Sequence, residues 1–247
     1  MPGAHGHDLK IAWGITGAGH FLRESFDVFK KLRAGDLKVT TFVSRAGEEV
    51  IRMYGLRETL AGISGGEYLE ELFLESGHGA SVPKTGRFLL HKYDALIVSP
   101  ATSNTTAKIA YGIADTIVTN AVAQAVKGEV PVFIVPVDIS GYVESKMPFF
   151  IDREICMRCE LCLPLENCPV NAITYQIDLL KCNGCGLCVK LCSYGAIRGG
   201  MAKLKVRDID ARNVKKLREL EGITVLENPS YIPDVIEKLK SMQKLKY

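Results

Sequence analysis

All 8 cysteines of this 247-residue chain lie in two short runs, ICMRCELCLPLENCPVNAI from residue 155 and KCNGCGLCVKLCSYGAI from residue 181. Each run has a CxxCxxC core followed by a fourth cysteine. The runs supply Cys156, Cys159, Cys162 and Cys168, and then Cys182, Cys185, Cys188 and Cys192. A CxxCxxC loop presents three thiolates to a [4Fe–4S] cube, and the fourth comes from the other run. The spacing therefore predicts two [4Fe–4S] clusters, the first triplet completed by Cys192 and the second by Cys168.

Zinc and disulfides are the alternatives for so many cysteines. Zinc sites usually pair two CxxC units across a longer gap, so each triplet would leave surplus thiolates. Disulfides are rare in reducing compartments, and the N-terminal residues MPGAHGHDLK do not resemble a signal peptide. A single cluster could serve only to stabilise a small domain. Two adjacent clusters favour electron transfer.

The two cysteine runs end in similar motifs, NAI at residues 171–173 and GAI at residues 195–197. This internal repeat resembles the bacterial two-cluster ferredoxin family over about residues 150–200. Two departures alter loops but remove no ligand: Glu166 and Asn167 lengthen the gap before Cys168, and Ser193 replaces the usual proline. We expect a small α+β ferredoxin domain at residues 148–200.

Composition excludes several classes of function. The chain is 47% hydrophobic and 24% charged, with a net charge of +3 and no block of five like charges, so nucleic-acid binding has no support. Its apolar runs, such as VPVFIVPV at residues 130–137, are too short to span a bilayer. We expect a cytoplasmic protein with no membrane partner. Residues 1–9 are expected to be disordered, and His5 and His7 there are not expected to bind metal.

Residues 10–147 alternate between strand and helix patterns. Near-continuous apolar runs predict buried strands, and apolar residues at helical spacing predict the helices between them. The expected strands are 10–15, 38–44, 95–100 and 131–136, and the expected helices are 21–32, 46–54, 105–112 and 115–127. This order predicts a doubly wound, Rossmann-like parallel sheet. Residues 201–247 are expected to form a helix–strand–helix extension.

Three loops rich in small residues follow the predicted strands: ITGAGH, SRAG and SPATSNTT. The carboxyl ends of parallel strands meet at one edge, where such sheets bind ligands. Gly17 and Gly19 allow close backbone approach, and five hydroxyl groups surround them, on Thr16, Ser44, Thr102, Ser103 and Thr105. The pattern favours a phosphate, although a single glycine turn is often ordinary turn chemistry. Neither the GxGxxG fingerprint nor a P-loop is present.

The segment PATSNTTAKIAYGIADTIVTNA at residues 100–121 resembles the PASANT motif of the homo-oligomeric flavin-containing cysteine decarboxylase superfamily. ITGAGH is similar to the FMN-phosphate loop of that superfamily, and the resemblance covers about residues 10–140. It implies bound FMN and assemblies built from trimers. It also implies a phosphate site of Thr16, Gly17, Gly19 and Ser44, with Pro100, Thr102, Ser103, Asn104 and Thr105 along the ribityl chain and flavin ring.

The chain lacks the residues that the superfamily's decarboxylases use. Their histidine falls at Gly86 here, and PVDISGYVESKMP from residue 136 does not contain the PxMNxxMW motif. Decarboxylation of a peptidyl cysteine is therefore not expected. His91 is offset by five residues and is interpreted as a surface or packing histidine.

Fusion of an FMN domain to two clusters implies electron transfer from the clusters to the flavin and on to an organic acceptor. The combination is similar to the archaeal dihydromethanopterin reductase (acceptor) group, which implies reduction of a dihydropterin. No catalytic residue is assigned. The alternatives are an electron carrier between proteins, and a redox sensor or binding module.

Some aromatic and basic residues leave two interpretations open. Trp13, Tyr111 and Tyr142 could stack on a ring, but single aromatics are more often core residues. Four lysines near the C-terminus could attract an acidic electron donor such as ferredoxin, or could form an ordinary solvated surface. They are Lys203, Lys205, Lys215 and Lys216.

Overall fold

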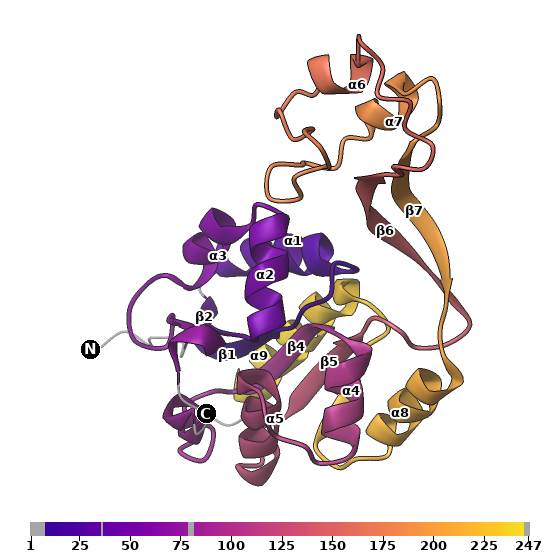
Figure 1. The fold of residues 1–247 in the computed structure, drawn as a ribbon. Coiled ribbons are helices and arrows are strands. Elements are labelled where there is room, and N and C mark those ends of the chain that lie inside the picture. Colours follow the sequence, from indigo (N-terminus) through magenta and orange to yellow (C-terminus); the bar gives the residue numbers. More distant parts are fainter. Residues whose placement is uncertain (1–7, 36, 79–81, 245–247) are drawn as a thin grey trace.

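The computed structural model describes residues 8–35, 37–78 and 82–244. The expectations for His5 and His7 lie outside these residues. Six parallel strands form the central sheet in the order β3-β2-β1-β4-β5-β8 (Figure 1). They are β1 Leu9–Ile15, β2 Leu37–Val43, β3 Leu72–Leu74, β4 Ala95–Ala101, β5 Val132–Pro136 and β8 Ile223–Val225. The predicted doubly wound, Rossmann-like fold is confirmed.

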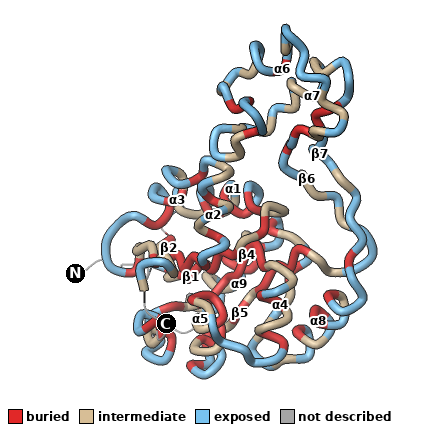
Figure 2. Tube along the Cα trace, viewed as in Figure 1, coloured by how far each residue is buried: buried red, intermediate tan, exposed pale blue. Residues whose placement is uncertain are grey.

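Helices cover both faces of the sheet. One face packs against α1 Leu22–Arg33, α2 Arg45–Met53, α3 Arg57–Ser64 and α9 Ile232–Lys244. The other packs against α4 Ser103–Ala110, α5 Ile117–Lys127 and α8 Asp208–Arg218. Buried residues therefore follow the strands and the inner helix faces, as Figure 2 shows. None of the helices in the described ranges is long and apolar enough to cross a membrane.

Alternation along the strands explains the two cores. Ile11, Trp13 and Ile15 of β1 point into one core, while Ala12 of the same strand belongs to the other. Such inward-facing residues on both faces are what a parallel sheet covered by helices requires. Apolar residues at helical spacing in α1, such as Phe26 and Phe29, meet the first set.

A two-stranded antiparallel ribbon extends from the sheet domain. It consists of β6 Tyr142–Ile151 and β7 Ile197–Lys205. Both cysteine runs lie between its strands, at the end away from the sheet, with the short helices α6 Leu163–Glu166 and α7 Leu187–Leu191 (Figure 1). We call residues 142–205 the cluster arm. Its own small core contains Phe149, Ile173 and Ile197.

The structure shows how the expected domain boundaries relate to these elements. The boundary expected between residues 147 and 148 falls inside β6, because Met147 pairs with Gly200 in the ribbon. Residues 201–247 include the end of β7 as well as α8, β8 and α9. Since β8 pairs with β5 in the central sheet, this C-terminal segment is an integral part of the sheet domain.

Candidate functional site

A cavity of about 620 Å³ opens at the carboxyl edge of the sheet. It lies where β1, β2 and β4 end, as the order of the strands predicts. Five of the nine expected flavin-binding residues line it: Gly17, Ser44, Thr102, Asn104 and Thr105. The structure therefore brings the three small-residue loops together around one space of a size that suits a small-molecule ligand.

Two glycines allow the first loop to lie close to its neighbours. A Cβ atom on Gly17 would be 2.5 Å from the Cβ of Ala46, in the first turn of α2. A Cβ atom on Gly19 would overlap the hydroxyl of Tyr54, which follows the same helix. Any larger residue at either position would push the loop away from α2.

Thr16 joins two of the loops and does not line the cavity. Its side chain is buried, and its Oγ1 donates a hydrogen bond of 2.8 Å to the carbonyl oxygen of Pro100. Thr16 Oγ1 also accepts a hydrogen bond of 2.9 Å from the backbone N–H of Thr102. Thr16 and Pro100 therefore link the two loops, and the direct ligand contacts expected for them stay a prediction.

The expected residues Ser103 and Gly19 also lie outside the cavity lining. The Ser103 hydroxyl donates to the Asp138 carboxylate, at the carboxyl end of β5. Burial lowers the pKa of His20, which follows Gly19, while the carboxylates of Glu24 and Asp138 oppose that shift. A histidine and a carboxylate thus lie beside the loops at the carboxyl edge of the sheet, and neither was predicted as a site residue.

Helices α2, α4 and α5 all begin at the cavity. Their capping residues are Ser44, Thr102 and Thr116, whose hydroxyls accept hydrogen bonds from backbone N–H groups of the first turn. Helix N-termini are partially positive and favour an anion. The cavity thus combines hydroxyl groups with positive backbone ends, which suits a phosphate.

Glu75 already occupies part of this positive edge. One of its carboxylate oxygens accepts from the N–H of Arg45 at 2.7 Å, and the other accepts from the N–H of Ile117 at 2.9 Å. Its carboxylate thereby links the first turns of α2 and α5. Sequence reasoning missed Glu75 because it missed β3. Had LFL been identified as a strand, Glu75 would have been expected at the same edge.

The structure also places the aromatic residues, the histidine and the lysines that the sequence left open. Trp13 is fully buried, and its ring stacks on that of Phe29 with 4.1 Å between the ring centroids. Its indole N–H donates to the carbonyl oxygen of Ser99, so Trp13 is a core residue. Tyr111 and Tyr142 are exposed, which contradicts the core interpretation. His91 is exposed. The lysines lie on two elements, β7 and α8: Lys216 covers the Tyr111 ring and Lys203 the Tyr142 ring.

The cluster arm brings four cysteines around one cavity of about 450 Å³. They are Cys156, Cys159, Cys162 and Cys192. These are the four residues that crossed ligation assigns to one cluster. In the described parts of the chain, no three His, Cys, Asp or Glu side chains form a group that could hold a single metal ion.

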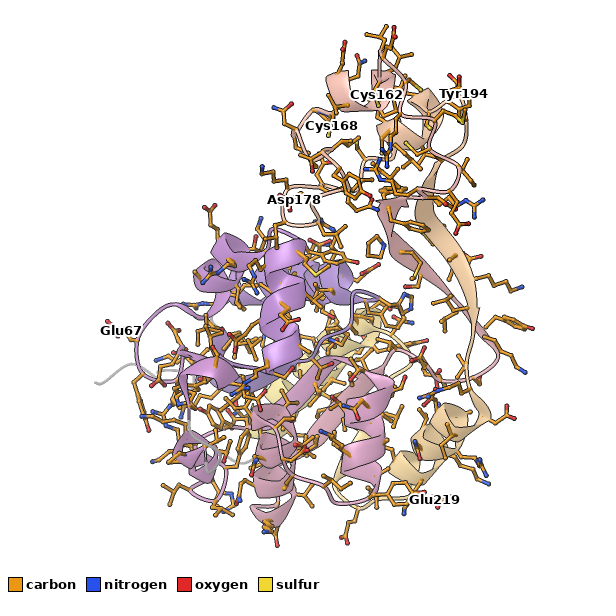
Figure 3. The ribbon with its side chains drawn as sticks, in the orientation of Figure 1. Glu67, Cys162, Cys168, Asp178, Tyr194 and Glu219 are labelled. Carbon is orange, nitrogen blue, oxygen red and sulfur yellow. The ribbon has the colours of Figure 1, made fainter. Side chains whose placement is uncertain are left out.

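Two of the remaining cysteines, Cys168 and Cys182, lie on the side of the arm that faces the sheet domain. Figure 3 shows Cys162 at the outer end of the arm and Cys168 between it and Asp178. Cys168, Cys182 and Cys188 pack against the small core of the arm. The sulfur of Cys168 accepts from the N–H of Ala172 at 3.3 Å, and that of Cys182 from the N–H of Gly184 at 3.4 Å. Such N–H donors stabilise thiolate ligands.

The protein combines a Rossmann-like domain that has a ligand cavity with an arm that is rich in cysteine. These two parts define an iron–sulfur flavoprotein. The Flavoprotein family model matches residues 3–144, and the 4Fe-4S binding domain model matches residues 175–198. The expectation of a flavin domain joined to a ferredoxin domain is confirmed.

Named relatives cover nearly the whole chain. Dihydromethanopterin reductase (acceptor) of Methanosarcina mazei is 62% identical over 231 residues, which are 90% of this chain and 97% of that protein. The protein of the same name from Methanocaldococcus jannaschii is 54% identical over 91% of this chain and 94% of its own length. The chain thus belongs to the Flavoprotein family, in the same group as these two reductases, and is an oxidoreductase.

A solved structure has the same fold. It is that of DmrB from Burkholderia xenovorans in complex with FMN, described as a cubic protein cage for redox transfer. The TM-score is 0.65 at 23% identity, with 96% of this chain and 98% of that chain covered. This likeness supports the fold described above.

Proposed function

We propose that this protein uses two [4Fe–4S] clusters and FMN to reduce dihydromethanopterin to tetrahydromethanopterin. The observation that carries the proposal is the presence, in one chain, of the sheet-edge cavity and of a second cavity lined by four cysteines. The names of the two archaeal relatives supply the substrate.

FMN fits the residues of the sheet-edge cavity. The hydroxyls of Ser44, Thr102 and Thr105 and the first turns of three helices would hold the phosphate and ribityl groups. Gly17 leaves room for the backbone to approach the ligand, and Asn104 offers an amide to the ring. Thr16, Pro100, Gly19 and Ser103 would act by fixing these loops. A phosphate would have to share the positive edge with the carboxylate of Glu75.

Two clusters fit the cysteine arm. Cys156, Cys159, Cys162 and Cys192 surround one cavity, which supports crossed ligation for the first site. We assign the second site to Cys168, Cys182, Cys185 and Cys188. FMN can accept electrons singly and release them as a pair, so clusters beside it supply one electron at a time to a two-electron reduction.

We infer a flavin domain formed by about residues 10–141 together with the C-terminal segment from about residue 206, and a ferredoxin-like cluster arm at 142–205, in a cytoplasmic homo-oligomer built from trimers. Exposed apolar side chains at the outer end of the arm, including Met157, Leu161 and Tyr194, favour a protein such as ferredoxin as the external electron donor.

Anaerobic titration tests this function. Protein reduced with dithionite and freed of excess reductant should be reoxidised stoichiometrically by dihydromethanopterin, with the flavin absorbance recovering as product forms. Reoxidation only by protein acceptors would support an electron carrier without a small-molecule substrate and would contradict the reductase. The bound flavin, identified by mass spectrometry after release, should be FMN.

Cysteine variants test whether the arm binds the clusters and the sheet domain binds the flavin. Cys156→Ala and Cys182→Ala should each remove one cluster, halve the bound iron and slow flavin reduction, while FMN binding remains. Loss of FMN from either variant would contradict the proposed placement of the flavin in the sheet domain alone.

A further inference from the structure

A third, smaller cavity lies between the sheet domain and the cluster arm. From the sheet domain it is lined by Arg23, Met53 and Tyr54. From the arm it is lined by Met147, Pro148, Phe149, Leu179, Cys182, Asn183 and Gly184. The Cys182 loop therefore faces the sheet domain directly. Figure 3 shows the neighbouring residue Asp178 at this junction.

Tyr54 connects this junction to the first flavin-binding loop. It lines the small cavity together with Cys182, and its hydroxyl lies against Gly19. Arg23 contacts the same tyrosine, with its guanidinium 5.4 Å from the ring centroid and one N–H donating to the Tyr54 carbonyl oxygen. One side chain thus contacts both the cysteine loop's cavity and the loop that contains Gly17.

Helix α2 spans the same interval. Its first residues, Arg45 and Ala46, line the sheet-edge cavity, and its last residue, Met53, lines the junction. At about 1.5 Å per residue, this helix of nine residues is ~13 Å long, so the two cavities lie at opposite ends of a short helix.

The cavity lined by four cysteines has no such contact. All its lining residues come from the arm itself, between Ile151 and Ile197. Cys162 and Tyr194 of that lining lie at the outer end of the arm in Figure 3. The two sets of cysteines therefore differ in position: Cys182 of the second run faces the sheet domain, whereas the cavity of Cys156, Cys159, Cys162 and Cys192 is formed by the arm alone.

We propose that the site of Cys168, Cys182, Cys185 and Cys188, the near site, exchanges electrons with the flavin. The site of Cys156, the remote site, receives electrons from outside the chain. Tyr54 is the positioning residue between the near site and the loop that contains Gly17 and Gly19. This inference rests on the proposed function. Each transfer oxidises one cluster by one electron and reduces the next group by one. Two transfers supply the electron pair of the flavin, and an external one-electron donor protein re-reduces the remote site.

Electron paramagnetic resonance tests the order of the two sites. A nearby paramagnetic cluster speeds the spin relaxation of a flavin radical, and this effect falls steeply with distance. In the partly reduced protein, Cys156→Ala should retain fast relaxation of the flavin signal, and Cys182→Ala should show relaxation slower by severalfold. The reverse pattern would overturn the inference.

Cofactor content separates this outcome from failure of the proposed function. Both variants should bind one flavin per chain and about half of the wild-type iron. If the wild-type protein bound no flavin or no iron–sulfur cluster, the proposed function itself would fail. If both cofactors bind and the relaxation pattern is reversed, only the assignment of the near site is wrong.

Tyrosine variants test the junction in the full-length wild-type background, where no cluster ligand is changed. Tyr54→Ala should slow the spin relaxation of the flavin and the reduction of flavin by pre-reduced clusters, whereas Tyr54→Phe, which keeps the ring, should retain most of both. Tyr231→Ala is the matched control, because Tyr231 is half exposed and lines neither cavity. Equal behaviour of Tyr54→Ala and Tyr231→Ala would contradict the role of Tyr54.

Discussion

The hydroxyl of Tyr54 lies against the backbone of Gly19, so that a Cβ atom on Gly19 would overlap it. The contact joins the end of α2 to the loop that follows β1. A tyrosine hydroxyl is protonated at neutral pH, and burial raises the pKa of the Tyr54 hydroxyl further. The position of the loop after β1 therefore depends on the neutral, packed side chain of Tyr54 and on the absence of a side chain at Gly19, which faces it.

Gly19→Ala should weaken flavin binding through this contact. The added methyl must displace either the tyrosine ring, which Arg23 holds, or the loop. We expect FMN affinity to fall about tenfold, equivalent to ~1.4 kcal/mol, measured by quenching of flavin fluorescence. The double variant Gly19→Ala/Tyr54→Phe should recover affinity, because it removes the overlapped oxygen. Gly62→Ala is the control, since a Cβ there meets no atom within 4 Å. Unchanged affinity in Gly19→Ala would show that the loop tolerates displacement.

Thr16→Val should lower the free energy of unfolding by about 1–2 kcal/mol, because it leaves the part-buried N–H of Thr102 without its acceptor. It also removes the bond to the Pro100 carbonyl. Denaturant unfolding can be followed by the fluorescence of Trp13, the single tryptophan, which is fully buried. Thr16→Ser keeps the hydroxyl and should lose much less. Equal stability of the valine and serine variants would contradict a structural role for the hydroxyl.

The sequence predicted the parts of the fold that depend on local patterns. The strands β1, β2, β4 and β5 are apolar runs buried on both faces, and their predicted bounds agree with the structure to within about a residue. The loops after them meet at one edge because parallel strands end there. The shared location of Gly17, Ser44 and Thr102 therefore followed from the order of the strands.

The parts that depend on distant contacts were not predicted. The three residues of β3 are too few to show an alternating pattern of apolar and polar residues. They form a strand because they pair with the edge of β2. β6 contains Pro148, and its sequence alone gives no reason to pair it with residues 197–205. The hydrogen bonds of Thr16 to Pro100 and Thr102 were also not predicted, since the sequence alone does not show whether a loop hydroxyl contacts a ligand or a neighbouring loop.

Glu71→Gln should destabilise the protein in a pH-dependent way. Arg87 donates to both oxygens of this carboxylate, one at 3.0 Å, and the bonds lower the pKa of Glu71. Both side chains are largely shielded from water. A charge-assisted pair of this kind is worth about 1–2 kcal/mol.

The sign of the pH dependence follows from the lowered pKa. The stabilisation is fully present above the ordinary pKa of glutamate and is lost as the pH falls through the lowered pKa in the folded state. The stability difference between wild type and Glu71→Gln should therefore be constant near neutral pH and shrink below about pH 4. Urea unfolding at several pH values measures it. A difference that grew on acidification would contradict the ion pair. Glu58→Gln, on the surface of α3, is the control.

Gly199→Ala should disturb the cluster arm without disturbing the flavin site. Gly199 has φ 120°, and a Cβ there would overlap the carbonyl oxygen of Pro148 and lie 2.8 Å from the Cα of Phe149. Both neighbours are backbone atoms of β6, at the point where the register of the ribbon shifts. Strain of this kind costs about 1–3 kcal/mol, so the ribbon must deform. We expect iron content to fall and protease cleavage between β6 and β7 to rise, while FMN affinity stays within about twofold, a difference below ~0.5 kcal/mol. Met201→Ala, at an exposed position in β7, should change neither quantity. Loss of FMN together with iron in Gly199→Ala would mean that the arm and the flavin cavity fold as one cooperative unit.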